Sequence, residues 1–448
     1  MRRMIWMLAA LSVLPLAAFS QLAPTPPMGW NSWDSYGLTI TEAEFKQNVS
    51  WFNTHLKPYG WKYVVIDEGW YLAHPENAGT KGADQGYTLD ANGRYTPAPG
   101  RFPSAANGAG LKALAAYAHS LGLKFGIHII RGIPKEAVER NLPIADSSFH
   151  AADAADKADT CRWNPDNYGV KNNAAGQAYY DSIAKLYAGW GIDFVKVDCI
   201  SAPYKQGEIH MMSAALSKTG RPIVLSLSPG PTPLEDAADV TKQAQMWRIS
   251  NDFWDVWSQQ NNDPHGFPQN AVQQFLLVSQ WEQFAGPGHW PDADMLPFGT
   301  LGPRPGWQQP RKSRLTADEQ RTIFTLWSIA RSPLVLGANL TQMDAATEAL
   351  LTNREVIAVN QASTGNQALM HTPQSWIWTA KATSAKGEYV ALFNVSNGPL
   401  DMEYTWQDLG LAAGKHTARD LWQHKDLSSS TGVKVKIAPH ASVLYRVE

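Results

Sequence analysis

The chain has 448 residues, a formal net charge of −2, 44% hydrophobic residues and 17% charged residues. This length is sufficient for one large folded domain and a smaller second one. The net charge is near zero and no basic stripe runs through the sequence, which argues against nucleic acid as a partner. The 19 tryptophans are typical of carbohydrate-binding clefts and also of ordinary aromatic cores.

Residues 1–20 are predicted to form a secretory signal peptide. Arg2 and Arg3 provide a charged start, residues 4–18 are apolar, and residues 18–20 (Ala-Phe-Ser) form a small-x-small cleavage site. The apolar part is shorter than the roughly 20 residues that a membrane span needs, and no later run approaches that length. We therefore expect an exported mature protein, periplasmic or extracellular, without membrane contact after signal removal. A signal anchor is the alternative.

Residues 21–361 are predicted to form a (β/α)8 barrel, the TIM-barrel fold of the α/β class. Short apolar runs alternate with amphipathic stretches, and no G-x-G-x-x-G motif follows a strand to favour the alternative, a doubly wound open sheet. Strands are expected at 28–33, 63–68, 124–130, 194–199, 223–228, 245–250, 289–295 and 333–336, and helices at 41–55, 110–121, 177–190 and 316–331.

Residues 362–448 are predicted to form a separate small antiparallel β-sandwich. Alternating segments such as 389–393, 433–437 and 442–447 are separated by turn residues, including Asn-Gly-Pro at 397–399. No helical period occurs between them, which is typical of an all-β domain.

The predicted strand at 194–199 places a cation and a carboxylate side by side. Lys196 and Asp198 are two residues apart, so their side chains project to the same face of the strand. Burying both charges is costly unless they are paired or used in chemistry. A structural ion pair and a functional site are the two explanations that this segment alone leaves open.

Residues capable of chemistry follow most of the predicted strands, at the end of a barrel where active sites lie. Carboxylates occur at four strand ends, together with Lys, Arg and Trp, which favours a shared functional site over independent capping roles. In chain order these residues are Trp30, Asn31, Trp33, Asp67, Glu68, Trp70, His128, Lys196, Asp198, Ser226, Ser228, Arg248, Asn251, Asp252, Asp292 and Asp294.

Carboxylates with aromatic neighbours and no Cys/His ligand cluster favour glycoside hydrolysis over metal-dependent hydrolysis, so no metal is expected. One carboxylate would act as nucleophile and another as acid, and a separation of about 5–5.5 Å would imply retention of configuration. Asp198 is the expected nucleophile, because Lys196 and Arg248 would favour its ionised form. Asp252, four residues after Arg248, is the expected acid/base. The reverse assignment stays open on physical grounds.

The chain has two cysteines, Cys161 and Cys199. In an exported protein they are predicted to form a disulfide that tethers the segment around Cys161 to the end of the strand at 194–199. Two free thiols are the alternative, because the sequence does not give the distance between them.

Several motifs are similar to those of the melibiase family, the α-galactosidases of glycoside hydrolase family 27. They are residues 26–33 (PPMGWNSW), Trp247-Arg248 followed by Asp252, residues 286–296 (GPGHWPDADML) and the C-terminal sandwich, so the resemblance covers nearly the whole mature chain. The resemblance implies a retaining exo-glycosidase without a cofactor, with Asp198 as nucleophile and Asp252 as acid/base. It also implies a pocket for one sugar made by Trp30, Asp67, Glu68, Lys196, Arg248 and Asp294.

Three residues depart from the pattern of the family. Its members usually carry Asp-Asp at the position of Asp67-Glu68, where the two carboxylates hold the fourth and sixth hydroxyls of galactose. The extra methylene of Glu68 would fill the space of the hydroxymethyl group, which β-L-arabinopyranose lacks, and such a misfit is worth about 1–3 kcal/mol. Ser228 stands where galactosidases place a Glu that contacts the second hydroxyl, and His128 stands where a Tyr is common.

The first expectation is therefore an α-galactosidase that acts on galactose- or arabinopyranose-containing oligo- or polysaccharides, and the alternative is a β-L-arabinopyranosidase. A small residue at Ser228 resembles the α-N-acetylgalactosaminidases, which are a further alternative. A non-catalytic sugar-binding barrel would have lost Asp198 or Asp252, and both are present. The sequence leaves the oligomeric state open.

Overall fold

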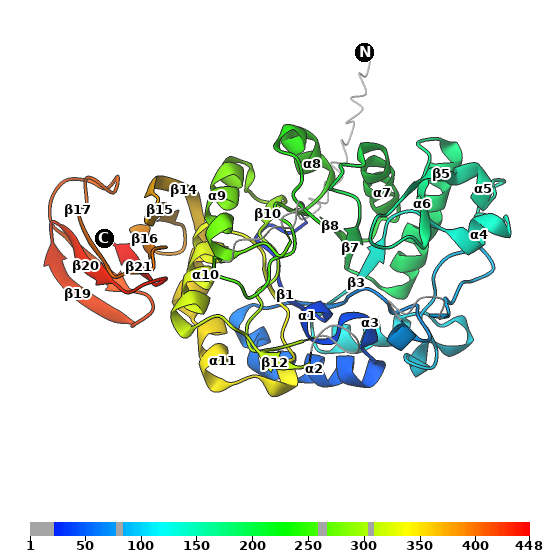
Figure 1. Ribbon diagram of the computed structural model, residues 1–448, viewed down its shortest axis with the longest axis horizontal. Coiled ribbons are helices and arrows are strands. Elements are labelled where there is room, and N and C mark those ends of the chain that lie inside the picture. The colour runs from blue at the N-terminus through cyan, green and yellow to red at the C-terminus, as the bar shows by residue number, and fades with distance from the viewer. Residues whose placement is uncertain (1–21, 78–83, 259–266, 303–308) are drawn as a thin grey trace, which may run out of the picture.

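The computed structural model describes residues 22–77, 84–258, 267–302 and 309–448, and Figure 1 shows a large barrel domain beside a smaller β domain. The predicted signal peptide, residues 1–20, lies outside the described residues. Within these ranges no helix is both long and apolar enough to cross a membrane.

Eight parallel strands form a curled sheet, which confirms the predicted barrel. Their order is β10-β9-β8-β7-β3-β2-β1-β13. The two ends of the sheet meet at Leu296, whose N–H donates to the Val335 carbonyl at 2.7 Å and whose carbonyl accepts from the Gly337 N–H at 3.2 Å. The strands are β1 (Met28–Asn31), β2 (Tyr63–Ile66), β3 (Lys124–Ile130), β7 (Phe194–Asp198), β8 (Val224–Leu227), β9 (Met246–Arg248), β10 (Trp290–Asp292) and β13 (Leu334–Leu336).

Helices pack around the outside of this sheet (Figure 1). Thr41, Asn270 and Thr316 each begin a helix with a reciprocal capping box, which satisfies backbone N–H groups of the first turn. The longer helices are α2 (Glu42–His55), α3 (Lys112–Ser120), α6 (Ala174–Trp190), α7 (Gln206–Lys218), α9 (Ala271–Trp281) and α10 (Ala317–Ile329), and the shorter ones α1 (Trp33–Tyr36), α4 (Lys135–Glu139), α5 (Ala151–Ala154), α8 (Ala237–Gln243), α11 (Ala345–Leu351) and α12 (Arg354–Gln361).

An antiparallel insertion between β3 and α6 was not predicted from the sequence. It consists of β4 (Ile133–Pro134), β5 (Ala155–Thr160) and β6 (Asn167–Val170), in the order β4-β6-β5. The turn between β5 and β6 contains Cys161, and its following residues reach the carboxyl ends of the barrel strands. A second small addition pairs β11 (Thr300–Leu301) with β12 (Arg311–Lys312).

The C-terminal domain is the predicted antiparallel β-sandwich. One sheet has the order β14-β15-β16-β21-β18-β19, and β17 pairs with β20 in the other. Apolar side chains such as Ile377, Leu392, Met402 and Trp406 form its own core. The strands are β14 (Ser363–Thr372), β15 (Ser375–Ala382), β16 (Glu388–Asn394), β17 (Leu400–Thr405), β18 (His416–Asp420), β19 (Lys425–Ser430), β20 (Gly432–Ile437) and β21 (Ser442–Val447).

The sandwich shares part of its core with the barrel. Successive side chains of a strand point to opposite faces of the sheet. Trp376 and Phe393 therefore join the barrel core, whereas their neighbours Ile377 and Leu392 face into the sandwich. The ring of Phe275 on α9 lies 5.8 Å from that of Trp376 and 5.1 Å from that of Phe393, measured between centroids. The two domains are thus joined by a continuous apolar contact.

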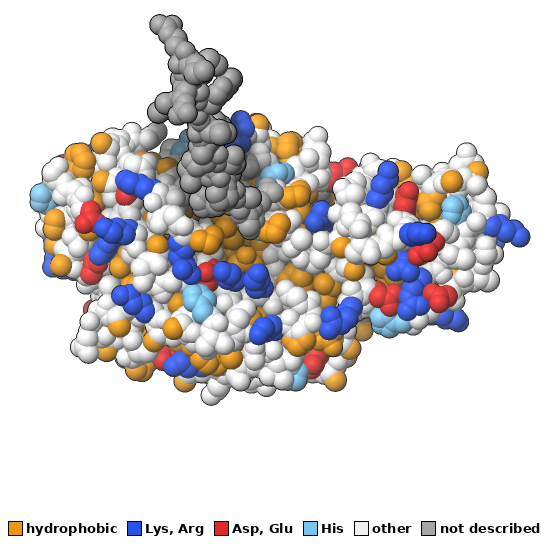
Figure 2. Space-filling model, turned by 180° about the vertical axis from the view of Figure 1, so that it is seen from behind, with side chains coloured by type: hydrophobic (Ala, Val, Ile, Leu, Met, Phe, Trp, Pro, Cys, Tyr) orange, Lys and Arg blue, Asp and Glu red, His pale blue; other side chains and the backbone are white. Residues whose placement is uncertain are grey.

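The surface carries charges of both signs. On the face seen in Figure 2, Lys and Arg side chains are spread among acidic and polar ones over both domains. This distribution agrees with the small net charge of the chain.

Phe275→Ala should lower the free energy of unfolding by about 3–5 kcal/mol, because it leaves a cavity in the core shared by the two domains. Urea denaturation would measure the change. Leu276→Ala is a matched control on the same helix, because Leu276 is 51% exposed and its loss should cost no more than about 0.5 kcal/mol. Equal losses for both variants would contradict a shared core.

Candidate active site

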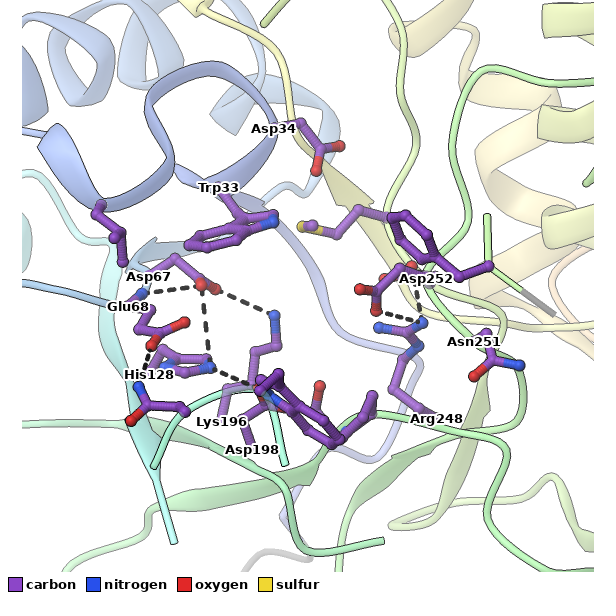
Figure 3. A pocket seen from close by; sticks show the side chains of 18 of the residues that line it. Trp33, Asp34, Asp67, Glu68, His128, Lys196, Asp198, Arg248, Asn251 and Asp252 are labelled. Carbon is purple, nitrogen blue, oxygen red and sulfur yellow. Dashed lines mark hydrogen bonds and ion pairs between the residues drawn. The ribbon is translucent and has the colours of Figure 1, made fainter. Parts of the chain in front are cut away.

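A cavity of about 590 Å³ opens at the carboxyl ends of the barrel strands (Figure 3). It collects nine of the ten catalytic and sugar-binding residues named from the sequence. These are Asp67, Glu68, His128, Lys196, Asp198, Ser228, Arg248, Asp252 and Asp294.

The tenth residue, Trp30, does not line the cavity, so that prediction is corrected. Side chains alternate along β1, and Trp30 points outward, where its ring packs 6.1 Å from that of Phe45 and its indole N–H donates to the Ala338 carbonyl at 2.7 Å. It is fully buried. Trp33, just past the end of the strand, lines the cavity instead (Figure 3).

Lys196 occupies the centre of the site, where its side chain rises among the surrounding carboxylates (Figure 3). Its Nζ lies 3.1 Å from Oδ2 of Asp67. Burial alone would lower the pKa of Lys196, but the charges of Asp67, Asp198 and Asp294 raise that pKa above its ordinary value. The ammonium therefore stays charged across the neutral range.

Asp67 is fixed by several donors besides Lys196. The Asn31 side-chain amide donates to Oδ2 at 2.6 Å, and the Glu68 backbone N–H donates to Oδ1 at 2.8 Å. Burial works against ionisation, but the nearby charges of His128 and Lys196 lower the pKa of Asp67. Asp67 is thus a buried, oriented hydrogen-bond acceptor.

Asp198, at the end of β7, is also held in its ionised form. Its Oδ2 lies 3.7 Å from Nε2 of His128 and accepts a hydrogen bond from the Trp163 indole N–H at 3.1 Å. Burial would raise the pKa of Asp198, but His128 and Lys196 together hold it well below its usual range. Arg248, which was expected to share this role with Lys196, is replaced in it by His128.

Arg248, on the other side of the cavity, pairs with two carboxylates. Its Nη2 lies 2.9 Å from Oδ2 of Asp294 and 3.2 Å from Oδ1 of Asp252. The Arg248 side chain is only 2% exposed, whereas that of Asp252 is 45% exposed. Asp252 therefore lies at the mouth, tethered on one side and open to solvent on the other.

Asp294 is deeper and more constrained. Its Oδ2 also accepts the Phe253 backbone N–H at 2.7 Å. Burial raises the pKa of Asp294 to about 7, with Arg248 opposing the rise and the charges of Asp252 and Asp292 adding to it.

Glu68 is held by a residue that the sequence analysis did not name. The side-chain amide of Asn164 donates to its Oε1 at 2.6 Å. Burial raises the pKa of Glu68 to about 7; the charge of Asp198 adds to this rise, whereas His128 and the Asn164 hydrogen bond oppose it.

The predicted disulfide between Cys161 and Cys199 is present, with a Cα–Cα distance of 5.9 Å. It joins the turn after β5 to the residue that follows Asp198. Trp163 and Asn164 lie two and three residues after Cys161 and contact Asp198 and Glu68, respectively. The tether was predicted from the sequence but these two residues were not, although their proximity to Cys161 was the available signal.

Asp34 is a third cavity residue that was not predicted from the sequence. It lines the cavity and is 1% exposed, and its Oδ2 has no hydrogen-bond partner within the part of the chain that the structure describes. Burial, with the nearby charge of Asp294, raises the pKa of Asp34 well above its ordinary value. Ser228 is buried and lines the same cavity, and its backbone N–H donates to the Val197 carbonyl at 2.9 Å.

Comparison with known proteins agrees with this architecture. Residues 166–362 match the family model described as alpha galactosidase A, and residues 372–447 match the alpha galactosidase C-terminal beta sandwich domain. Alpha-galactosidase 2 of Arabidopsis thaliana is 30% identical over 95% of this chain and 89% of its own length. Alpha-galactosidase A of Cellvibrio japonicus is 29% identical over 96% of this chain and 93% of its own length.

A solved structure is more similar in sequence than these relatives. It is a β-L-arabinopyranosidase of glycoside hydrolase family 27 from Geobacillus stearothermophilus, in complex with arabinose. It is 43% identical, superimposes with a TM-score of 0.88, and the match covers 95% of this chain and 97% of that one.

The charge of Glu68 should make stability depend on pH. The pKa of Glu68 is about 7 in the folded protein, above its ordinary value of 4.5. Between pH 4.5 and pH 7 the folded state therefore binds more protons than the unfolded state, so the free energy of unfolding falls as pH rises through this range. Glu68→Gln should therefore gain about 1–3 kcal/mol relative to the parent between pH 4.5 and pH 8, measured by urea denaturation.

Asp294 titrates in both proteins, so its contribution cancels in this comparison. Glu139→Gln, at an exposed position on α4, controls for the loss of one acidic group. A Glu68→Gln difference that stays constant from pH 4.5 to pH 8 would contradict the assignment.

Proposed function

The chain belongs to glycoside hydrolase family 27, and we propose that it is a retaining exo-glycosidase that prefers terminal β-L-arabinopyranosyl groups to α-D-galactosyl groups. The preference is carried by Glu68, the carboxylate that replaces the shorter Asp expected at this position. The sequence motifs alone favour the galactoside as the first candidate. The 43% identity to an arabinopyranosidase, against 29–30% to the α-galactosidases, supports reversing that order.

The two-carboxylate mechanism assigns different roles to Asp198 and Asp252. An oxygen of the ionised Asp198 attacks the anomeric carbon while Asp252 donates a proton to the leaving-group oxygen, so the glycosidic bond breaks as the glycosyl ester forms. Asp252 then removes a proton from water, which attacks the same carbon and releases Asp198. Two inversions give net retention. The burial of Asp198 beside His128 and Lys196 supports the first role, and the exposure of Asp252 supports the second.

The same charges can hold the sugar. Asp67 presents an oriented carboxylate, Lys196 presents N–H donors, and Trp33 provides an aromatic wall. Together they match the hydroxyls and the apolar face of one pyranose ring. We assign further contacts to His128, Ser228, Arg248 and Asp294, which line the same cavity.

Glu68 would act by filling space. It is one methylene longer than Asp, and its hydrogen bond to Asn164 fixes where its carboxylate ends. A hydroxymethyl group at C5 of the sugar would compete for this volume, and β-L-arabinopyranose has none. One methylene in a closed pocket changes discrimination by about 1–3 kcal/mol, or roughly 10- to 200-fold.

α-Galactosidase activity is the second candidate. The names of the matching family models and of the curated relatives favour it, since all of them are α-galactosidases. The two activities need the same catalytic pair and differ in whether the sugar pocket has room for a hydroxymethyl group at C5.

Asp198→Ala should lower kcat by about 10⁴-fold or more while the fold is kept, because the residue forms the covalent intermediate. Turnover of the p-nitrophenyl glycoside and the circular dichroism spectrum would measure the two effects. Asp181→Ala, an aspartate on α6 outside the cavity, serves as the matched control.

Azide would distinguish this assignment from its reverse. With an activated substrate, Asp198→Ala should give a glycosyl azide of inverted configuration, because azide replaces the nucleophile. Asp252→Ala should give the retained product, because azide replaces the attacking water. If Asp198→Ala gave the retained azide and Asp252→Ala the inverted one, Asp252 would be the nucleophile and Asp198 the acid/base.

Glu68→Asp should shift the ratio of kcat/KM for p-nitrophenyl β-L-arabinopyranoside over p-nitrophenyl α-D-galactopyranoside toward galactoside by about 10- to 200-fold, because it reopens the space for the hydroxymethyl group. The parent enzyme should favour the arabinoside. If the parent favours galactoside and the variant changes little, Glu68 has no part in selectivity and the second candidate stands.

A further inference from the structure

One buried carboxyl group in the wall of the cavity has no partner in the protein. Asp34, in the first turn of α1, is 1% exposed, and in Figure 3 its carboxyl group points into the cavity that it lines. Within the described ranges no salt bridge reaches this group, and its Oδ2 has no hydrogen-bond partner. A buried polar group without a partner costs free energy. Its position in the cavity wall points to a partner that arrives with the ligand.

Buried carboxylates that serve only the fold of this protein are bonded differently. Asp193 accepts hydrogen bonds from the Phe125 backbone N–H at 2.9 Å and from the Arg221 guanidinium at 2.6 Å. Asp255 accepts a backbone N–H at 2.7 Å. Both side chains are buried and neither lines the cavity. Asp34 is as deeply buried as these two, and a structural role would give it donors of the same kind.

The position of Asp34 is fixed by its neighbours. Its backbone carbonyl accepts the Gly302 N–H at 2.9 Å, and the hydroxyl of Ser35 donates to the Gly337 carbonyl at 2.9 Å. A Cβ atom at residue 337 would lie 2.0 Å from Oδ2 of Asp34, so the glycine makes room for the carboxyl group. A group that is positioned before its ligand arrives loses little conformational freedom on binding.

The surroundings of Asp34 favour its neutral form. Burial raises the pKa of Asp34 well above its ordinary value, and the charge of Asp294 adds to this rise. The charges of Asp67 and Asp252 act in the same direction, whereas that of Lys196 opposes them. A neutral carboxyl group donates a hydrogen bond through its O–H and accepts one at its other oxygen. The hydroxyls of a sugar are suitable partners for both.

We propose that Asp34 is a further binding residue for the hydrolysed sugar and that its carboxyl group donates a hydrogen bond to one ring hydroxyl. This inference rests on the proposed glycosidase function. It adds an uncharged contact to those that the charged residues of the cavity provide.

The test measures Ki for the free sugar and kcat/KM for its p-nitrophenyl glycoside, with the glycone that the parent prefers. Asp34→Leu replaces the polar group by an apolar one of similar size. It should raise Ki and lower kcat/KM by about ten-fold or more, because a sugar hydroxyl loses its partner in a buried site. Asp34→Asn keeps a neutral donor and acceptor at this position and should restore both values to within about three-fold of the parent.

Deoxy sugars separate a contact from a change of shape. On the glycoside that lacks the contacted hydroxyl, the parent and Asp34→Leu should have the same kcat/KM within about two-fold, because the hydrogen bond is absent in both. On the other monodeoxy glycosides the ten-fold difference should remain.

Ser35→Ala is a matched control at the neighbouring position. It removes the hydrogen bond to the Gly337 carbonyl, and Ser35 does not line the cavity. This variant should lower the free energy of unfolding in urea and leave Ki unchanged. A rise in Ki as large as that of Asp34→Leu would assign the loss to local packing and refute the contact.

The remaining outcomes are distinct. If the parent is active and Asp34→Leu keeps its Ki, or loses equally on every deoxy glycoside, the contact is refuted while the proposed function stands. If Asp34→Asn loses as much as Asp34→Leu, the group acts as a charged acceptor and its assignment as a donor is wrong. If the parent neither hydrolyses nor binds arabinopyranose or galactose derivatives, the proposed function fails and this inference fails with it.

Discussion

The buried ammonium of Lys196 sets the charge balance on which the cavity depends. An unpaired cation at this depth would be strongly destabilising, and it is tolerated because Asp67 lies 3.1 Å away and the charges of Asp198 and Asp294 act on it. The dependence is mutual. Without Lys196 and its neighbour His128, the buried carboxylates would repel one another and take up protons. These buried charges stabilise one another only when they lie close together. Strands β2, β3 and β7, which carry them at or near their ends, must therefore end at the same level of the barrel.

A second buried cation organises the other half of the cavity. Arg248 is shared between the deep Asp294 and the exposed Asp252, so the two proposed catalytic carboxylates differ in environment. Asp198 is enclosed by fixed positive charge, whereas Asp252 meets solvent. Pairs of carboxylates in contrasting surroundings can divide nucleophilic and proton-transfer work at one pH. In this protein the contrast follows from how far each residue lies beyond the end of its strand.

Much of this arrangement could be predicted from the sequence, because a parallel barrel places every strand end at one face. The eight strands lie within one to three residues of their expected bounds, and nine of the ten predicted catalytic and sugar-binding residues line one cavity. The prediction for Trp30 was wrong because side chains alternate along a strand, and Trp30 lies on the outward-facing side of β1. Trp163 and Asn164 were missed because an antiparallel insertion carries them across the strand ends, and their proximity to Cys161 was the signal for them in the sequence. The charge partner of Asp198 was misjudged because distances between side chains on different strands cannot be read from a sequence.

The disulfide between Cys161 and Cys199 gives the proposed chemistry a dependence on redox conditions. The bond closes a loop with a sequence separation of 38, which is worth about 4 kcal/mol in chain entropy, and it ends next to Asp198. Thiol reductants would remove a covalent restraint from the turn that carries Trp163 and Asn164 while leaving the barrel ladder itself untouched. Preparations made in reducing and oxidising environments would then share a fold but differ in how well one wall of the cavity is ordered. The number of free thiols in a sample would therefore have to be measured before its activity is compared with that of another sample.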